Sequence, residues 1–219
     1  MSDILKIGVL ASGRGSNFQS IIDNIESGHI KAEMTVLITD NPDAYAIERC
    51  RKHNIESLVL KPGDFSDTNA YYTHIAEELM KRDAGLVVLA GFMRVVGKAL
   101  IDKYPNRIMN IHPALLPSFP GLHGQKQAVD YGVKIAGCTV HFVDEGVDTG
   151  PIIIQAAVPA YHDDTEDSLS ERILRKEHEI FPFAIRLFAE NKIKVEGRKV
   201  IIICNREDQS MVNPLELDK

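Results

Sequence analysis

Short apolar runs alternate with amphipathic stretches along the first half of the chain. The runs are rich in Val, Ile and Leu without strict alternation, which is typical of strands covered on both faces. They lie at residues 4–11, 34–39, 56–60, 86–90 and 108–111. The stretches between them place apolar side chains on one helical stripe, at residues 17–27, 43–53 and 69–82. This alternation predicts an α/β fold with an open, mostly parallel, Rossmann-like sheet and helices on both faces.

Pro and Gly punctuate the stretch after the fifth run and predict a long loop-rich region. Two strands are then predicted at residues 137–143 and 152–159, with a turn-rich loop between them. Capping oxygens and acids at residues 163–166 predict the start of a helix that ends near Asn191. A terminal hairpin is predicted at residues 194–203.

The composition is that of a soluble globular protein, because 44% of the 219 residues are hydrophobic and 26% are charged. The net charge of −6 argues against non-specific binding to nucleic acid or to an anionic membrane. No apolar run approaches the ~20 residues of a membrane span, and the N-terminus does not resemble a signal peptide. We expect a single domain over residues 1–203 and a loose polar tail over residues 204–219.

The three cysteines, Cys50, Cys138 and Cys204, show neither a zinc-binding spacing nor a disulfide framework. They are predicted to be reduced and mostly buried thiols, which fits a cytoplasmic protein.

A glycine-rich loop, Gly13-Arg14-Gly15-Ser16-Asn17, joins the first predicted strand to the first predicted helix. Backbone amides and the helix dipole make this context suitable for a phosphate. Phe18 occupies the third glycine position of the dinucleotide-binding motif, which argues against a nicotinamide site. Asp40, which ends the second strand, is at a distance that would suit such a site. The structural alternative is a tight turn capped by Ser16.

Asn110 and His112 close the fifth predicted strand, two residues apart and therefore on one face. Ligands of open α/β sheets bind beyond the carboxyl ends of strands, so a site is expected there. His141 and Asp148 follow in the segment 137–150, although such residues are more often a structural histidine and a turn former. No metal-binding helix motif and no nucleophile elbow is found, so a metal and a covalent serine mechanism are not expected.

Several motifs together resemble the folate-dependent formyltransferases, and the resemblance extends from about Ile4 to about Val200. The matching segments are 12–17, 88–94, 109–117, 119–123 and 137–150, with Glu177-His178 before Phe181-Pro182. The loop Gly13-x-Gly15-Ser16-Asn17 narrows the resemblance to the branch that acts on glycinamide ribonucleotide.

The resemblance implies transfer of the formyl group of 10-formyltetrahydrofolate to the primary amine of N1-(5-phospho-D-ribosyl)glycinamide, in de novo purine (IMP) biosynthesis. Attack by the amine creates an oxyanion and releases a proton. Asn110 and His112 are expected to stabilise the oxyanion. Asp148 is expected to orient His112, to raise the pKa of its imidazole and to assist proton transfer.

The resemblance also implies binding residues. The substrate phosphate and ribose would contact Gly15, Ser16, Asn17 and Glu177. The folate would contact Met93, Arg94, Val95, Val96, Asn110, Asp144, Glu145, Gly146, Val147 and Asp148. The N-terminal half would thus bind phosphate and the C-terminal half folate, with Thr139 and His141 ordering the catalytic group and residues 115–132 forming a flap. Thr68 stands where relatives often carry an arginine for the folate tail.

Four other functions compete with this interpretation. A formyltetrahydrofolate deformylase usually carries an additional N-terminal domain, and an enzyme that formylates initiator tRNA carries a basic C-terminal one. A non-catalytic folate-binding relative would not need Asn110, His112 and Asp148, and a dehydrogenase would need the third glycine. The expected partners are the two small-molecule substrates, with neither nucleic acid nor membrane, and the chain is expected to be a monomer or a homodimer.

Overall fold

The computed structural model describes residues 4–203, 208 and 211. Clustering by contacts divides the chain into two compact units. The first unit contains the described residues up to 110 together with 143–145, and the second contains 111–142 and the described residues from 146 onward. Cys204 and nearly all of the predicted tail at 204–219 lie outside the described residues. That residues 1–203 act as one domain stays a prediction.

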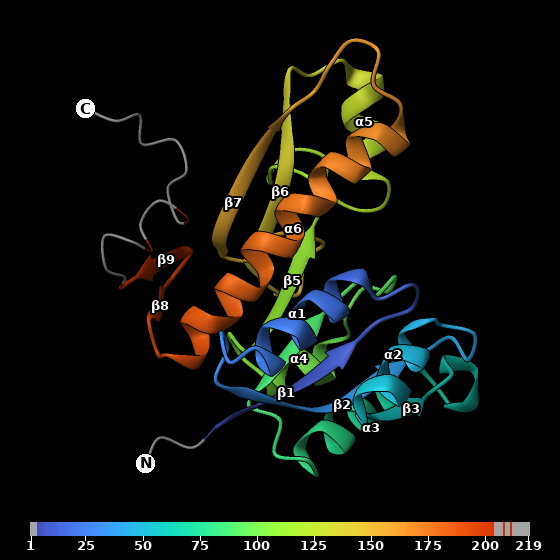
Figure 1. The fold of residues 1–219 in the computed structure, drawn as a ribbon. Coiled ribbons are helices and arrows are strands. Elements are labelled where there is room, and N and C mark those ends of the chain that lie inside the picture. Colours follow the sequence, from blue (N-terminus) through green and yellow to red (C-terminus); the bar gives the residue numbers. More distant parts are fainter. Residues whose placement is uncertain (1–3, 204–207, 209–210, 212–219) are drawn as a thin grey trace. The chain divides into compact units, whose positions relative to one another are not determined.

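Five parallel strands form the sheet of the first unit, in the order β3-β2-β1-β4-β5 (Figure 1). They are β1 (Leu5–Leu10), β2 (Ala32–Thr39), β3 (Glu56–Val59), β4 (Leu86–Leu89) and β5 (Ile108–His112), the last of which ends in the second unit. Each apolar run of the sequence forms one of these strands. The parallel pairing confirms the predicted α/β class.

The helices of the first unit are α1 (Ser16–Glu26), α2 (Ala46–His53), α3 (Thr68–Met80) and α4 (Lys98–Lys103), with a 3-10 turn at Pro62–Asp64. The predicted stripes are the buried faces: α1 buries Phe18, Ile21 and Ile22. Helix α3 places Tyr71, Ile75 and Leu79 in a core shared with the strands. Helix α4 was not predicted, because six residues are too few to show a stripe.

The two strands predicted for the second half of the chain are β6 (Ile135–Phe142) and β7 (Ile152–Pro159), and they pair antiparallel. Helix α6 (Glu166–Ala189) packs along both strands (Figure 1). Its predicted start is confirmed, because Thr165 and Ser168 form a reciprocal capping box. The predicted hairpin is β8 (Ile193–Glu196) and β9 (Lys199–Ile202).

Helix α5 (Gly124–Tyr131) lies in the stretch that was predicted to be loop. Its eight residues lie between His123 and Gly132, which both adopt left-handed backbone conformations. The pattern of apolar positions did not predict this helix, because glycines and prolines surround it.

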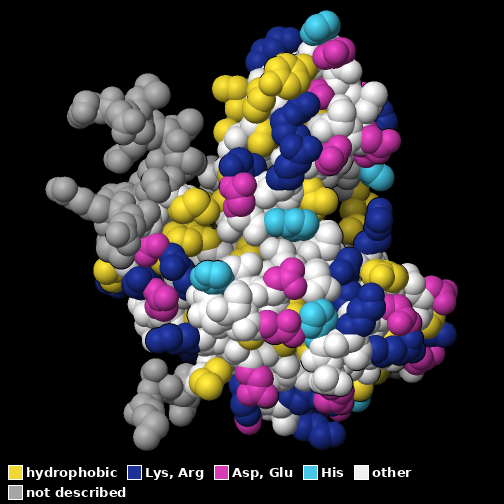
Figure 2. All heavy atoms as spheres, viewed as in Figure 1, with side chains coloured by type: hydrophobic (Ala, Val, Ile, Leu, Met, Phe, Trp, Pro, Cys, Tyr) yellow, Lys and Arg dark blue, Asp and Glu magenta, His cyan; other side chains and the backbone are white. Residues whose placement is uncertain are grey.

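Lysines, arginines and acidic side chains are interspersed over the face drawn in Figure 2. None of the helices in the described part of the chain is long and apolar enough to cross a membrane.

Gly137 tests how closely β6 and β7 pack. A Cβ at this position would lie 2.0 Å from the carbonyl oxygen of Ala156, which is backbone and has no room to move. We predict that Gly137→Ala lowers the free energy of unfolding by about 1–3 kcal/mol in chemical denaturation. The matched control is Gly63→Ala, since nothing lies within 4 Å of the Cβ added there. Equal stability of the two variants would contradict this packing.

Candidate active site

Gly15 shapes the glycine-rich loop of the first unit. It is the N-cap residue of α1 and has φ +66°, a left-handed conformation that favours glycine. No side chain caps the helix by a hydrogen bond at this end. Ser16 is therefore the first residue of the helix and not its cap, so the alternative of a turn capped by Ser16 is wrong. The loop and the following Asn17, which is buried, present a helix N-terminus suited to an anion.

The segment after β4 carries four of the predicted folate contacts. The backbone N–H of Met93 donates to Ser12 Oγ at 3.1 Å, which joins this segment to the end of β1. Met93 and Val95 are 62% and 61% exposed, whereas Val96 is buried. Two apolar side chains are therefore available to a flat ring.

The side chain of Arg94 is held by Asp40. In the sequence, Asp40 indicated only a nicotinamide site. Arg94 Nε donates to Asp40 Oδ2 at 2.7 Å, and this hydrogen bond raises the pKa of the guanidinium. Nearby in the first unit, Lys98 Nζ donates to Glu145 Oε1 at 2.5 Å and anchors the segment that contains Asp144. Asn110, also in the first unit, is paired with Leu89 of β4.

A half-buried carboxylate, that of Asp148, lies between two imidazoles in the second unit. His112 Nδ1 is 3.4 Å from Asp148 Oδ2, and His141 Nε2 is 3.6 Å from Asp148 Oδ1. Both histidines are buried, at 4% and 1% exposure. Asp148 has φ +54°, a left-handed conformation that Asp tolerates better than most residues. The structure thus brings together three of the predicted residues.

Two backbone groups of the predicted flap contact this cluster. The carbonyl of Phe119 accepts a hydrogen bond from His112 Nε2 at 2.8 Å, so the ring hydrogen is on Nε2. The N–H of Gly121 donates to Asp148 Oδ2 at 2.8 Å. Sequence reasoning missed both groups, because a backbone atom has no residue-type signal; the Pro120-Gly121 turn was the only hint.

The protonation of His112 differs from the prediction. Burial lowers the pKa of His112 below its ordinary 6.5, and this outweighs the hydrogen bond to Phe119 and the charge of Asp148, which act to raise it. The charge of Asp148 therefore acts in the predicted direction, but burial outweighs it and the net pKa of His112 is lowered, which favours the neutral imidazole. Burial also acts to raise the pKa of Asp148, but hydrogen bonds from His141 and Gly121 hold it below 3.8.

Thr139 fastens the segment that follows His112. Its hydroxyl donates to the carbonyl of Ala114 at 2.7 Å and accepts from the N–H of Leu116 at 3.0 Å. Gln155 Nε2 lies within hydrogen-bond distance of both Thr139 Oγ1, at 3.0 Å, and the Leu116 carbonyl, at 2.9 Å. Gln155 was not predicted, because nothing in its strand context marks it as functional.

Three further residues of the second unit were predicted to bind substrate or folate: Glu177, Val147 and Gly146. Glu177 is buried on α6, and its charge adds to burial in raising the pKa of the Cys138 thiol. Val147 is 47% exposed. Gly146 must lack a side chain, since a Cβ would lie 2.0 Å from Thr149 Oγ1.

Two of the three cysteines lie within the described residues. Cys50 and Cys138 are free and buried, which confirms the prediction for the two described thiols. Within the described ranges, no group of three or more His, Cys, Asp or Glu side chains is arranged to hold a metal ion.

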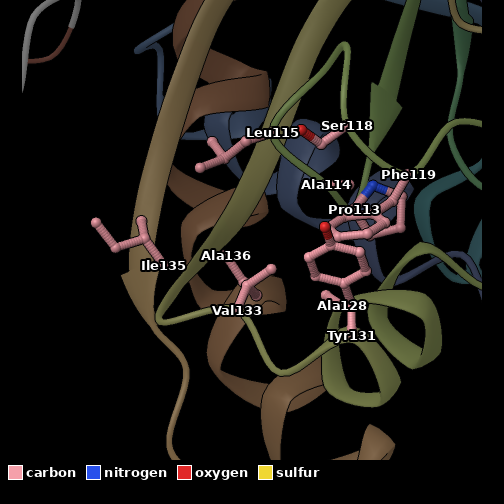
Figure 3. A pocket seen from close by; sticks show the side chains of 10 residues that line it. All are labelled: Pro113, Ala114, Leu115, Ser118, Phe119, Ala128, Tyr131, Val133, Ile135 and Ala136. Carbon is pink, nitrogen blue, oxygen red and sulfur yellow. The ribbon is translucent and has the colours of Figure 1, made fainter.

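A cavity of about 390 Å³ lies in the second unit between the segment after β5, helix α5 and β6 (Figure 3). Phe119 and Tyr131 face each other across part of it, with ring centroids 5.8 Å apart. The walls are mostly apolar and include none of the predicted catalytic side chains. Half of its ten lining residues belong to the predicted flap at residues 115–132.

Residues 5–185 match the family described as formyl transferase. The phosphoribosylglycinamide formyltransferase of Bacillus subtilis (strain 168) is 41% identical over 181 residues, which are 83% of this chain and 93% of that protein. The crystal structure of glycinamide ribonucleotide transformylase 1 from Symbiobacterium toebii matches with a TM-score of 0.92 and 48% identity, over 93% of this chain and 96% of that chain.

A longer relative, the trifunctional purine biosynthetic protein adenosine-3 of Drosophila melanogaster, is 45% identical over 184 residues. That match includes 83% of this chain but only 14% of the insect protein.

Removing the hydroxyl of Thr139 tests its role in the second unit. We predict that Thr139→Val lowers the free energy of unfolding by about 2 kcal/mol, because the Ala114 carbonyl loses one of its two donors and the N–H of Leu116 and the amide of Gln155 lose an acceptor. Thr35→Val is the control, because Thr35 is half-buried and its Oγ1 donates a hydrogen bond to the Ile7 carbonyl at 3.1 Å. Denaturant unfolding of both variants measures the difference, and an equal loss would contradict the special role of Thr139.

Proposed function

The chain belongs to the formyl transferase family, and from this premise we propose that it transfers the formyl group of 10-formyltetrahydrofolate to the primary amine of glycinamide ribonucleotide. The products are N2-formylglycinamide ribonucleotide and tetrahydrofolate, in the de novo synthesis of purines. The bacterial relatives are named for glycinamide ribonucleotide and match this chain over most of their length. This supports glycinamide ribonucleotide, and not water, as the acceptor of the formyl group. The observation that carries the chemistry is the half-buried Asp148 carboxylate beside His112.

The reaction needs a group that takes a proton from the attacking amine. Asp148 is suited to this role, since its pKa is below 3.8 and the carboxylate is ionised at neutral pH. The amine nitrogen forms a bond to the formyl carbon, the bond from that carbon to N10 of the folate breaks, and the proton passes from the amine to N10. No covalent intermediate with the protein is needed.

The developing oxyanion needs donors. We assign this role to the side-chain amide of Asn110 and to Nε2–H of His112, a neutral imidazole that donates without a full charge. The Phe119 carbonyl accepts this hydrogen in the present conformation. The formyl oxygen would therefore replace that carbonyl, which requires the flap segment to move when the substrate binds.

The binding roles follow from the same proposal. Backbone amides of Gly15, Ser16 and Asn17 would hold the phosphate at the start of α1, with Glu177 on the ribose. The exposed apolar side chains of the folate segments would flank the pterin ring: Met93, Val95 and Val147.

Arg94 would line the pterin pocket with these apolar side chains, whereas Thr68 at the start of α3 offers no cation to the folate tail. The reduced, buried thiols suit a cytoplasmic location.

A transfer assay with and without glycinamide ribonucleotide tests the function. We expect loss of 10-formyltetrahydrofolate only when the amine is present, with the N2-formyl product detected by mass spectrometry. An equal rate of cofactor loss without the amine would show a hydrolase and would contradict the proposed acceptor.

Variants test the roles of the residues in the same assay. We expect Asp148→Asn, Asn110→Ala and His112→Asn each to lower kcat by about 10²–10³-fold. The matched control is Asp83→Asn, because Asp83 forms an exposed ion pair with Lys6 outside the predicted site. Full activity of Asp148→Asn would rule out the carboxylate as the proton acceptor.

A further inference from the structure

The glycine-rich loop has to hold its shape for backbone amides to bind a phosphate. Glycines allow many conformations, so a loop with two of them loses more entropy on ordering than most loops. Gly15 is buried and left-handed, whereas Gly13 and Arg14 are exposed. Something outside the loop must therefore fix its conformation.

Helix α2 supplies that support. The backbone N–H of Ala46 donates to the carbonyl of Gly13 at 3.2 Å. A Cβ on Gly15 would lie 3.0 Å from the Cβ of Ala46, so the first turn of α2 lies directly against the loop. The same helix carries Arg49, one turn further on.

Arg49 contacts the loop region on both sides of Gly15. Its Nε donates to the carbonyl of Arg14 at 2.9 Å, and its Nη1 donates to Oε1 of Gln19 at 2.9 Å. The backbone N–H of Gln19 in turn donates to the Gly15 carbonyl at 2.9 Å. The guanidinium also lies over the ring of Tyr45, 5.1 Å from its centroid. The planar guanidinium of Arg49 therefore links Arg14, the residue before Gly15, to Gln19 in the first turn of α1.

We propose that Arg49 is a positioning residue for the substrate phosphate, which fixes the Gly15–Asn17 amides through Arg14 and Gln19. The inference rests on the proposed function of the loop as the phosphate site. A guanidinium is suited to this role, since its donors point in fixed directions and reach two acceptors at once. A lysine has one nitrogen, so it cannot reproduce both bonds in the same geometry.

Steady-state kinetics of Arg49→Ala and Arg49→Lys test the proposal. We expect KM for glycinamide ribonucleotide to rise about tenfold in Arg49→Ala and by a smaller factor in Arg49→Lys. KM for the formyl-folate and kcat should stay within about twofold, because the loop contacts the other substrate. Arg51→Ala is the matched control on the same helix, since Arg51 forms an exposed ion pair with Glu48.

Calorimetric titration with ribose 5-phosphate, without folate, gives a readout that does not need activity. We expect weaker binding to both Arg49 variants than to the wild type and to Arg51→Ala. If the wild type shows no formyl transfer but this difference in binding remains, the proposed function fails while the role of Arg49 stands.

Three outcomes would overturn the role of Arg49. One is an unchanged KM for the amine substrate in Arg49→Ala together with unchanged binding of ribose 5-phosphate. Another is an equal rise of both KM values with a fall in kcat, which would indicate a general structural effect. The third is wild-type behaviour of the more conservative Arg49→Lys, which would show that the two-point contact is not needed.

Discussion

A carboxylate that is almost withdrawn from water stays charged only when donors and positive partners replace the water it has lost. The side chain of Asp148 is 13% exposed, and it meets this requirement with hydrogen bonds from the N–H of Gly121 and from His141, while His112 lies beside it. These partners come from the flap, the end of β5 and β6. The second unit thus depends on one left-handed residue to keep a charged group beside His112, and the proposed chemistry depends on that charge.

Most of the fold could be predicted because its core is made of buried parallel strands and amphipathic helices. The runs around Leu10 and Val88 are largely apolar; β4 is buried along its whole length and β1 from Ile7 to Leu10. Helices α4 and α5 could not be predicted, because their six and eight residues are held by packing and by the turns that flank them. Local sequence carries little information about such elements.

The candidate site could be predicted as far as side chains define it. Position at the carboxyl end of a strand indicated Asn110 and His112, and the resemblance of the segment 137–150 indicated Asp148. The flap carbonyl on His112 and the amide on Asp148 could not be predicted, because their positions depend on the path of the backbone. The effect of the Asp148 charge on the pKa of His112 has the predicted sign, but the net lowering could not be predicted, because it comes from burial, which is a property of the folded chain.

NMR titration of the ¹⁵N-labelled imidazole of His112 tests most directly whether a charged Asp148 lies beside a neutral histidine. The account predicts an Nε2–H tautomer at pH 7 and a pKa below 6.5 in the free protein. In Asp148→Asn the pKa should fall further, because the carboxylate acts to raise it. A His112 that is protonated at pH 7, or whose pKa does not change in Asp148→Asn, would contradict the account.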